Sequence, residues 1–301
     1  MFLYKISNLK LKSYIEFPEL IKIKTKSIDL ELKEKPITLG EQKPFHNILN
    51  KNNRPWIKIY KDGNSYILYF LNLAKFKIIN KKIYYQKSNK QISDTIVRHL
   101  FLNQVIPYYL SLENLVLHCS AVSYKNKAYL FVGKSGQGKS TIASLLLNHA
   151  KLVSDDFVLI KKHKSNYYSI GSYPVIRLAN IVNANSNIVD SRNNYTNLKK
   201  NVFSLSNKCL FENKELKIKK IYFLNRLIKN KWKSISIKSK DLSYYFKYSL
   251  ENIFVLNPSC KKTKVKLTHS LIDLISQTEC QYLEFGDLAK SKTSDLAKKL
   301  L

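Results

Sequence analysis

The sequence lacks the cysteine pattern of a fold that is stabilised by disulfide bonds or by a structural zinc ion. It has four cysteines, which lie far apart and form no C-x-x-C pair: Cys119, Cys209, Cys260 and Cys280. This excludes a disulfide framework and a structural zinc site of the usual spacing. We therefore expect reduced and mostly buried thiols.

Long apolar runs are also missing. None reaches the roughly 18 residues that a membrane-spanning helix needs. Residues 1–17 are interrupted by Lys5, Lys10 and Lys12, where a secretory signal requires an unbroken apolar core. These absences predict a soluble cytoplasmic protein with no membrane partner. Apolar residues still make up 45% of the 301 residues, which suffices for the core of one large domain or two modest ones.

Acidic side chains are few, 21 against 52 lysines and arginines, so the net charge is +31. Lysines are spread from end to end alongside many Asn, Ile and Tyr residues, and charged residues as a whole are an average 24% of the chain. The spread favours the codon bias of an AT-rich genome as its cause. Attraction to an acidic partner is the alternative and would appear as salt-dependent binding. A nucleic-acid partner rests on charge alone and is disfavoured.

Glycine is rare as well, but three of the seven glycines fall within residues 133–138. Residues 133–140 read G-K-S-G-Q-G-K-S, after an apolar run at 128–132 and before a helical pattern at 141–147. This is the context of a phosphate-binding loop. Glycines let backbone N–H groups close around phosphate oxygens, and the following helix directs its positive end at the same anion. The segment predicts a site for a nucleoside triphosphate and Mg²⁺.

The residues expected to bind the nucleotide are those of this loop and the start of its helix. Lys139 would reach the β- and γ-phosphates, and the Ser140 hydroxyl would bind Mg²⁺. The full expected set is Gly133, Lys134, Ser135, Gly136, Gln137, Gly138, Lys139, Ser140 and Thr141.

Asp155 and Asp156 follow a predicted strand at residues 151–154. An acid at the end of an apolar strand near a phosphate loop is where such proteins hold their metal. Because side chains alternate along a strand, one carboxylate can face Mg²⁺ while the other meets the attacking group. A solvated turn is the alternative. His118 lies on the strand before the loop, where an isolated histidine is more often a core residue.

Short apolar runs bounded by turn residues predict a small β-rich domain over residues 1–95. Its strands are expected at 14–17, 21–23, 56–60, 65–70, 76–79 and 82–85. Residues 61–64 and 80–82 have the composition of hairpin turns. A helix at 93–112, capped by Ser93 or Asp94 and ended or kinked by Pro107, marks the start of a second domain, 96–301.

The second domain is expected to be a mixed α/β fold. Strands are predicted at 115–124, 128–132, 151–154, 157–160, 167–170, 175–178, 218–224 and 281–285, and helices at 141–147, 241–250 and 267–276. Residues 180–200 are Asn-rich and have no firm period, so they predict an irregular loop. Such a loop near a nucleotide is either a lid over the substrate or a plain surface loop.

Three segments in order, residues 117–122 (LHCSAV), 133–141 and 152–156 (LVSDD), resemble the HPr kinase/phosphorylase family. The chain is similar to the wider group of related serine kinases, which includes tailoring kinases of lasso-peptide clusters. The resemblance implies a P-loop kinase domain of the HPr kinase and phosphoenolpyruvate-carboxykinase type, with a mixed sheet, behind a small β-rich domain. It also implies the transfer of the ATP γ-phosphoryl group to a serine of a peptide or protein. Relatives often form oligomers.

The resemblance assigns roles by position. Lys139 would contact the phosphates, Ser140 and Asp155 would hold Mg²⁺, Asp156 would accept the serine proton, and His118 would be an active-site residue. Phosphorylase members carry a Glu-Ile-Arg-Gly-type segment beyond the acidic pair. We expect the Asn-rich loop in its place, with no such Glu, which disfavours phosphorolysis and HPr as the substrate.

Arg177 is the candidate for a second phosphate contact, ahead of Arg192. A small-molecule kinase and a non-catalytic ATP-binding switch or scaffold remain as alternatives.

Overall fold

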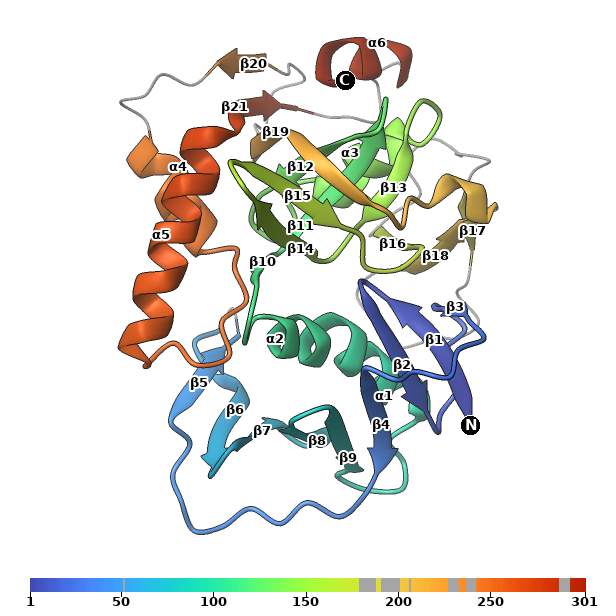
Figure 1. Cartoon of the computed structure of the whole chain (residues 1–301), viewed down its shortest axis with the longest axis vertical. Helices are drawn as coiled ribbons and strands as arrows, with labels where there is room; N and C mark the ends of the chain where they lie inside the picture. The colour runs from blue at the N-terminus through green and yellow to red at the C-terminus, as the bar shows by residue number, and fades with distance from the viewer. Residues whose placement is uncertain are drawn as a thin grey trace. The chain divides into compact units, whose positions relative to one another are not determined.

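The structure is a computed structural model that describes residues 1–50, 52–178, 188–190, 201–205, 207–226, 233–236, 242–286 and 293–301 (Figure 1). The chain divides into two compact units. The first comprises residues 1–112 and 256–263, and the second residues 113–255 and 264–301. Among the described helices, none is both long and apolar enough to cross a membrane.

The first unit is built on a sheet with the strand order β3-β1-β2-β4-β9-β8-β7-β6-β5. Its strands are β1 (Phe2–Ile6), β2 (Leu9–Ser13), β3 (Ile21–Lys22), β4 (Leu30–Glu34), β5 (His46–Leu49), β6 (Pro55–Asp62), β7 (Ser65–Phe70), β8 (Ala74–Ile79) and β9 (Lys82–Lys87). Apolar and polar residues alternate in β8 and β9, so one face is buried. Gly63 and Asn80 adopt positive φ angles of 55° and 50° in the two predicted hairpin turns. The predicted strand at 14–17 is wrong, because these residues form a bend after β2.

A helical segment follows the sheet: α1 (Asp94–Leu100), a π-helical turn (Phe101–Val105) and α2 (Ile106–Leu110). The Ser93 side chain caps α1 by accepting a hydrogen bond from the Ile96 N–H, as the sequence predicts. Pro107 does not end the helix; it lies in the first turn of α2, directly after the π-helical turn. Residues 96–112, expected to open the second domain, belong to the first unit. There Phe101 contacts Phe17 at 5.4 Å between ring centroids.

The second unit contains a mixed sheet in which β10-β14-β15-β19-β12-β11-β13 are neighbours in that order, with β21 beside β19 and β20 beside β21. Its strands are β10 (Leu115–Leu117), β11 (Cys119–Tyr124), β12 (Lys127–Val132), β13 (Lys151–Ser154), β14 (Val158–His163), β15 (Asn166–Ile170), β19 (Glu215–Arg226), β20 (Lys233–Ser236) and β21 (Glu279–Phe285). Strands β16 (Val175–Leu178), β18 (Asn201–Leu205) and β17 (Ile188–Asp190) form a separate small sheet.

Helices cover both faces of the β12–β19 region. They are α3 (Lys139–Leu146), α4 (Leu242–Leu250), α5 (Lys261–Gln277) and α6 (Thr293–Leu300). Phe131 and Tyr222 point to the face packed by α3 and α6, whereas Leu130 and Phe223 point to the opposite face, packed by α4 and α5. Figure 1 shows α4 and α5 together beside the sheet. Successive side chains of β12 therefore pack against helices on opposite faces of the sheet. This packing fixes the orientation of β12 and of the loop that follows it.

Several sequence predictions need correction here. The single strand expected at 115–124 is interrupted at His118, since β10 pairs with β14 whereas β11 pairs with β12 and β13. The strand expected at 157–160 starts one residue later and is longer, because β14 runs from Val158 to His163. Helix α5 starts at Lys261, six residues earlier than expected. Most of the Asn-rich segment and Arg192 lie outside the described residues, although 188–190 form β17. Of the thiols, Cys119 is buried, Cys209 is exposed, and Cys260 and Cys280 are half-buried.

Gly171 tests how tightly the end of β13 is held. A Cβ atom at this position would lie 2.3 Å from the carbonyl oxygen of Val153 and 2.9 Å from that of Glu212, and both are backbone atoms. We predict that Gly171→Ala lowers the free energy of unfolding by about 2 kcal/mol through overpacking. Gly40→Ala is the matched control, because its Cβ would meet no atom within 4 Å. Urea denaturation measures both, and equal midpoints would contradict this packing.

Candidate functional site

The glycine-rich loop, residues 133–138, joins β12 to α3. Gly136 and Gly138 have positive φ angles of 89° and 86°, and Gly138 is the residue before the first turn of α3. A side chain in this left-handed conformation costs roughly 1–2 kcal/mol, so the two glycines allow the turn. No side chain caps the helix, so the first N–H groups of α3 face the loop. The loop has the backbone form that accepts an anion.

Lys139 lies in the first turn of α3 and is only 7% exposed. Its Nζ donates to the carbonyl oxygen of Gly133 at 2.6 Å and contacts that of Lys134 at 3.4 Å. The ammonium therefore folds back over the loop. Ser140 and Thr141 follow it in the first turn of α3, and both are half-buried.

The sheet brings this loop and the acidic pair to one edge. Strand β11 pairs antiparallel with β12 on one side, with Cys119 opposite Val132, and antiparallel with β13 on the other, with Ala121 opposite Ser154. Strands β12 and β13 therefore run in the same direction, and both end beside the start of β11. Neighbouring strands are about 4.8 Å apart, so the two ends lie roughly 10 Å apart across one intervening strand.

Asp155 is 3% exposed, and each of its carboxylate oxygens accepts a hydrogen bond. Oδ1 accepts from the Ser120 hydroxyl at 2.7 Å, and Oδ2 accepts from the Arg177 backbone N–H at 2.7 Å. Strand β11 and strand β16 thus fix the carboxylate from two sides. An ionised carboxylate buried this deeply is stabilised by such charge-assisted bonds.

Asp156 is more accessible, with its side chain 17% exposed. Its Oδ2 accepts a hydrogen bond from the Tyr173 hydroxyl at 2.9 Å and forms an ion pair with the Arg177 guanidinium. Arg177 Nη1 also donates to the Tyr173 hydroxyl at 2.9 Å. The side chain of Arg177, expected at a phosphate, therefore lies against the acidic pair.

The Cys119 thiol lies between the two halves of the site. Burial raises its pKa, the Lys139 ammonium lowers it, and the Asp155 carboxylate raises it further. Cys119 is fully buried at the start of β11 and lies opposite Val132, the residue before the glycine-rich loop.

His118 occupies the corner between β10 and β11. Its Nδ1 is 2.7 Å from the Asp156 carbonyl oxygen, so this nitrogen carries a proton and donates it to that carbonyl. Its backbone N–H donates to the Asn252 carbonyl at 2.6 Å, and its ring stands edge-on to Phe254 at 6.0 Å. The histidine therefore lies beside the backbone of the acidic pair, and its role in an active site stays a prediction.

The sequence analysis missed the residues that hold these groups. Ser120 and Tyr173 bind the acidic pair, and Tyr248 of α4 contacts Gln137 of the loop. Nothing in their local sequence signals these roles, because each acts across at least 17 residues of chain. Only the fold brings them to the site.

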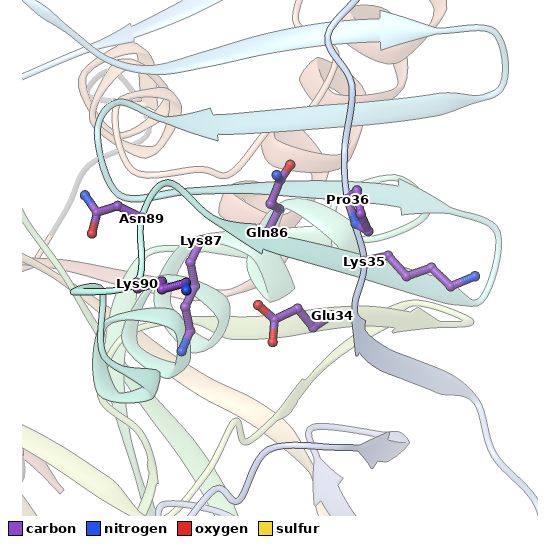
Figure 2. Close-up of a pocket in the computed structure, with 7 residues that line it drawn as sticks. All are labelled: Glu34, Lys35, Pro36, Gln86, Lys87, Asn89 and Lys90. Carbon is purple, nitrogen blue, oxygen red and sulfur yellow. The ribbon is translucent and has the colours of Figure 1, made fainter.

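A pocket in the first unit is lined by Glu34, Lys35, Pro36, Gln86, Lys87, Asn89 and Lys90 (Figure 2). Two of its polar groups bond within the protein. Lys87 pairs with Asp94 at 2.7 Å, and Gln86 Oε1 accepts the Ile37 N–H at 2.8 Å. The edge of the sheet in the second unit, where several charged groups converge, is the stronger candidate.

Comparison with known proteins gives only a distant likeness. No family model and no curated protein matches this sequence. Among solved structures, the chain is similar to the HPr(Ser) kinase/phosphatase from Coxiella burnetii, with 8% identity and a TM-score of 0.32 over 61% of this chain and 93% of that chain. A likeness of this extent does not define the chemistry, which rests on the contacts described above.

Ser120 provides a test of how the acidic pair is held. We predict that Ser120→Ala lowers the free energy of unfolding by about 1–3 kcal/mol, because it leaves a buried carboxylate oxygen without its hydroxyl donor. Ser123→Ala is the control, because it removes another buried hydroxyl from the same strand and does not touch the acidic pair. Chemical denaturation measures both. A loss no larger than that of the control would contradict the role of Ser120.

Proposed function

We propose that the second unit binds ATP and transfers its γ-phosphoryl group to a hydroxyl, with a serine of a peptide or protein as the preferred acceptor. One observation carries the proposal: the glycine-rich loop and the acidic pair leave the same sheet edge one strand apart. Phosphoryl transfer needs groups that hold the phosphates and a group that accepts the proton of the attacking hydroxyl, placed close to one another.

The residues present fit a nucleotide and a metal. The positive φ angles of Gly136 and Gly138 shape the loop, and a Cβ built on Gly136 would meet no atom within 4 Å. Each Asp155 oxygen accepts one hydrogen bond and keeps a second lone pair. Ser140 and Asp155 are the residues that would hold Mg²⁺. When bound, this ion offsets negative charge on the phosphate oxygens.

The protein side of the reaction follows from this arrangement. The backbone N–H groups of residues 134–140 and the Lys139 ammonium hold the phosphates, and Asp156 accepts the proton of the acceptor hydroxyl. The bond from the γ-phosphorus to the bridging oxygen breaks as the bond to the acceptor oxygen forms. The guanidinium of Arg177 forms an ion pair with Asp156 in this structure. In the reaction it would release that carboxylate and bind a phosphoryl oxygen instead.

A non-catalytic ATP-binding switch is the second candidate, and the same ion pair favours it. A carboxylate held by Arg177 and Tyr173 is a weak proton acceptor while it stays so bound. A small-molecule kinase differs from the main proposal only in the acceptor. Transfer to a serine peptide, to a small hydroxyl compound or to neither separates the three.

Two variants test the proposal through binding and transfer. We predict that Lys139→Ala weakens ATP binding by a factor on the order of 100, since it removes the buried cation of the loop. Lys151→Ala, which removes an exposed lysine at the start of β13, should leave binding unchanged. Asp156→Asn should bind ATP within about threefold of the parent yet lose transfer of labelled phosphate to serine peptides.

Fluorescence titration with an ATP analogue measures the binding affinity. Incubation with γ-labelled ATP and a serine peptide measures the transfer of phosphate. ATP binding without transfer to any hydroxyl donor would support the switch. Unchanged turnover in Asp156→Asn would contradict the role of this residue.

A further inference from the structure

Residues 248–254, the end of α4 and the chain after it, contact both halves of the candidate site. We call this segment the strap. On one side it meets the glycine-rich loop, and on the other it meets His118. From the sequence alone, this segment is predicted only as the end of a helix.

The loop side of the strap begins at Tyr248. Its hydroxyl contacts Gln137 Oε1 and lies 2.7 Å from the Leu224 carbonyl oxygen of β19. The same Gln137 oxygen accepts the Lys134 N–H at 2.7 Å, so the tyrosine and the loop backbone share one amide. Burial raises the pKa of Tyr248 above its usual value. Glu251 adds an ion pair with Lys134 at 3.2 Å, exposed and therefore weak.

The other side of the strap starts at Asn252, which is only 4% exposed. Its side chain donates to the Tyr248 carbonyl at 2.8 Å and closes the end of α4. Its own carbonyl accepts the His118 N–H at 2.6 Å. Ile253 forms a bridge with Leu117, and the Phe254 N–H donates to Val116 at 3.0 Å. The His118 corner is thus held by the same few residues that brace the loop.

We propose that the strap couples the glycine-rich loop to the His118 corner, with Tyr248 as the positioning residue. Loosening the Tyr248 hydroxyl contact frees Gln137, and through Asn252 it also loosens the His118 backbone. Through the strap, a change in the conformation of the loop alters the position of His118, which binds the carbonyl oxygen of Asp156. The coupling itself is a property of the free protein, whereas its effect on nucleotide affinity rests on the proposed function.

Tyr248→Phe in the full chain tests the coupling, and hydrogen exchange of backbone amides measures it. We expect the Lys134 and His118 amides to exchange about three- to tenfold faster than in the parent, the effect of one lost hydrogen bond. Tyr244→Phe, on the same helix and 45% exposed, is the matched control and should change neither amide. Amides of the β14–β15 hairpin serve as the reference and should keep their rates.

Three results would overturn the coupling: unchanged exchange at both amides, faster exchange at Lys134 alone, or an equal increase in the reference hairpin. Titration with an ATP analogue provides a separate arm. There Tyr248→Phe should weaken binding about three- to tenfold, and Tyr244→Phe should not. A parent that binds no nucleotide would overturn the proposed function, and the exchange rates would still decide the coupling. If Tyr248→Phe binds the nucleotide as tightly as the parent protein does, the strap has no effect on nucleotide affinity and this part of the proposal is overturned.

Discussion

The pairing of β11 between β12 and β13 is the constraint on which the site depends. Because both neighbours run antiparallel to β11, their ends meet at one edge, and the chain delivers the glycine-rich loop and the acidic pair there. A shift of one residue in either register would turn Cys119 and Ala121 to the opposite face and move the attached groups with them. Full burial of both side chains makes such a shift costly.

The charges at this edge are arranged as partners. Lys139 binds loop carbonyls, Asp155 accepts from Ser120 and from a backbone amide, and Asp156 pairs with Arg177. Burying any one of these ions alone would cost several kcal/mol. The protein therefore holds each charged group in a fixed direction, and the proposed phosphoryl transfer would use this electrostatic preorganisation. The strap extends this network to α4, so the loop, the histidine corner and a covering helix share one set of hydrogen bonds.

Local signals predicted much of this arrangement. The glycine cluster located the turn between β12 and α3, where Gly136 and Gly138 need left-handed backbone, and the Ser93 cap located α1. Short-range sequence could not show that His118 breaks one expected strand into two, because the break follows from pairing with β14 on one side and β12 on the other. Nor could it place Tyr173, Arg177 or Tyr248, whose partners are fixed by tertiary packing alone. Their roles at a nucleotide remain predictions.

The central claim is that the loop and the acidic pair hold one nucleotide together, with Asp155 on the ion that the phosphates bind. Electron paramagnetic resonance of Mn²⁺ with ATP tests it most directly, using protein whose aspartate carboxylates carry ¹³C. The account predicts that the bound Mn²⁺ couples both to ³¹P of the nucleotide and to ¹³C of a carboxylate, and that Asp155→Asn abolishes only the second coupling. Phosphorus coupling with no carboxylate coupling in the parent protein would contradict it.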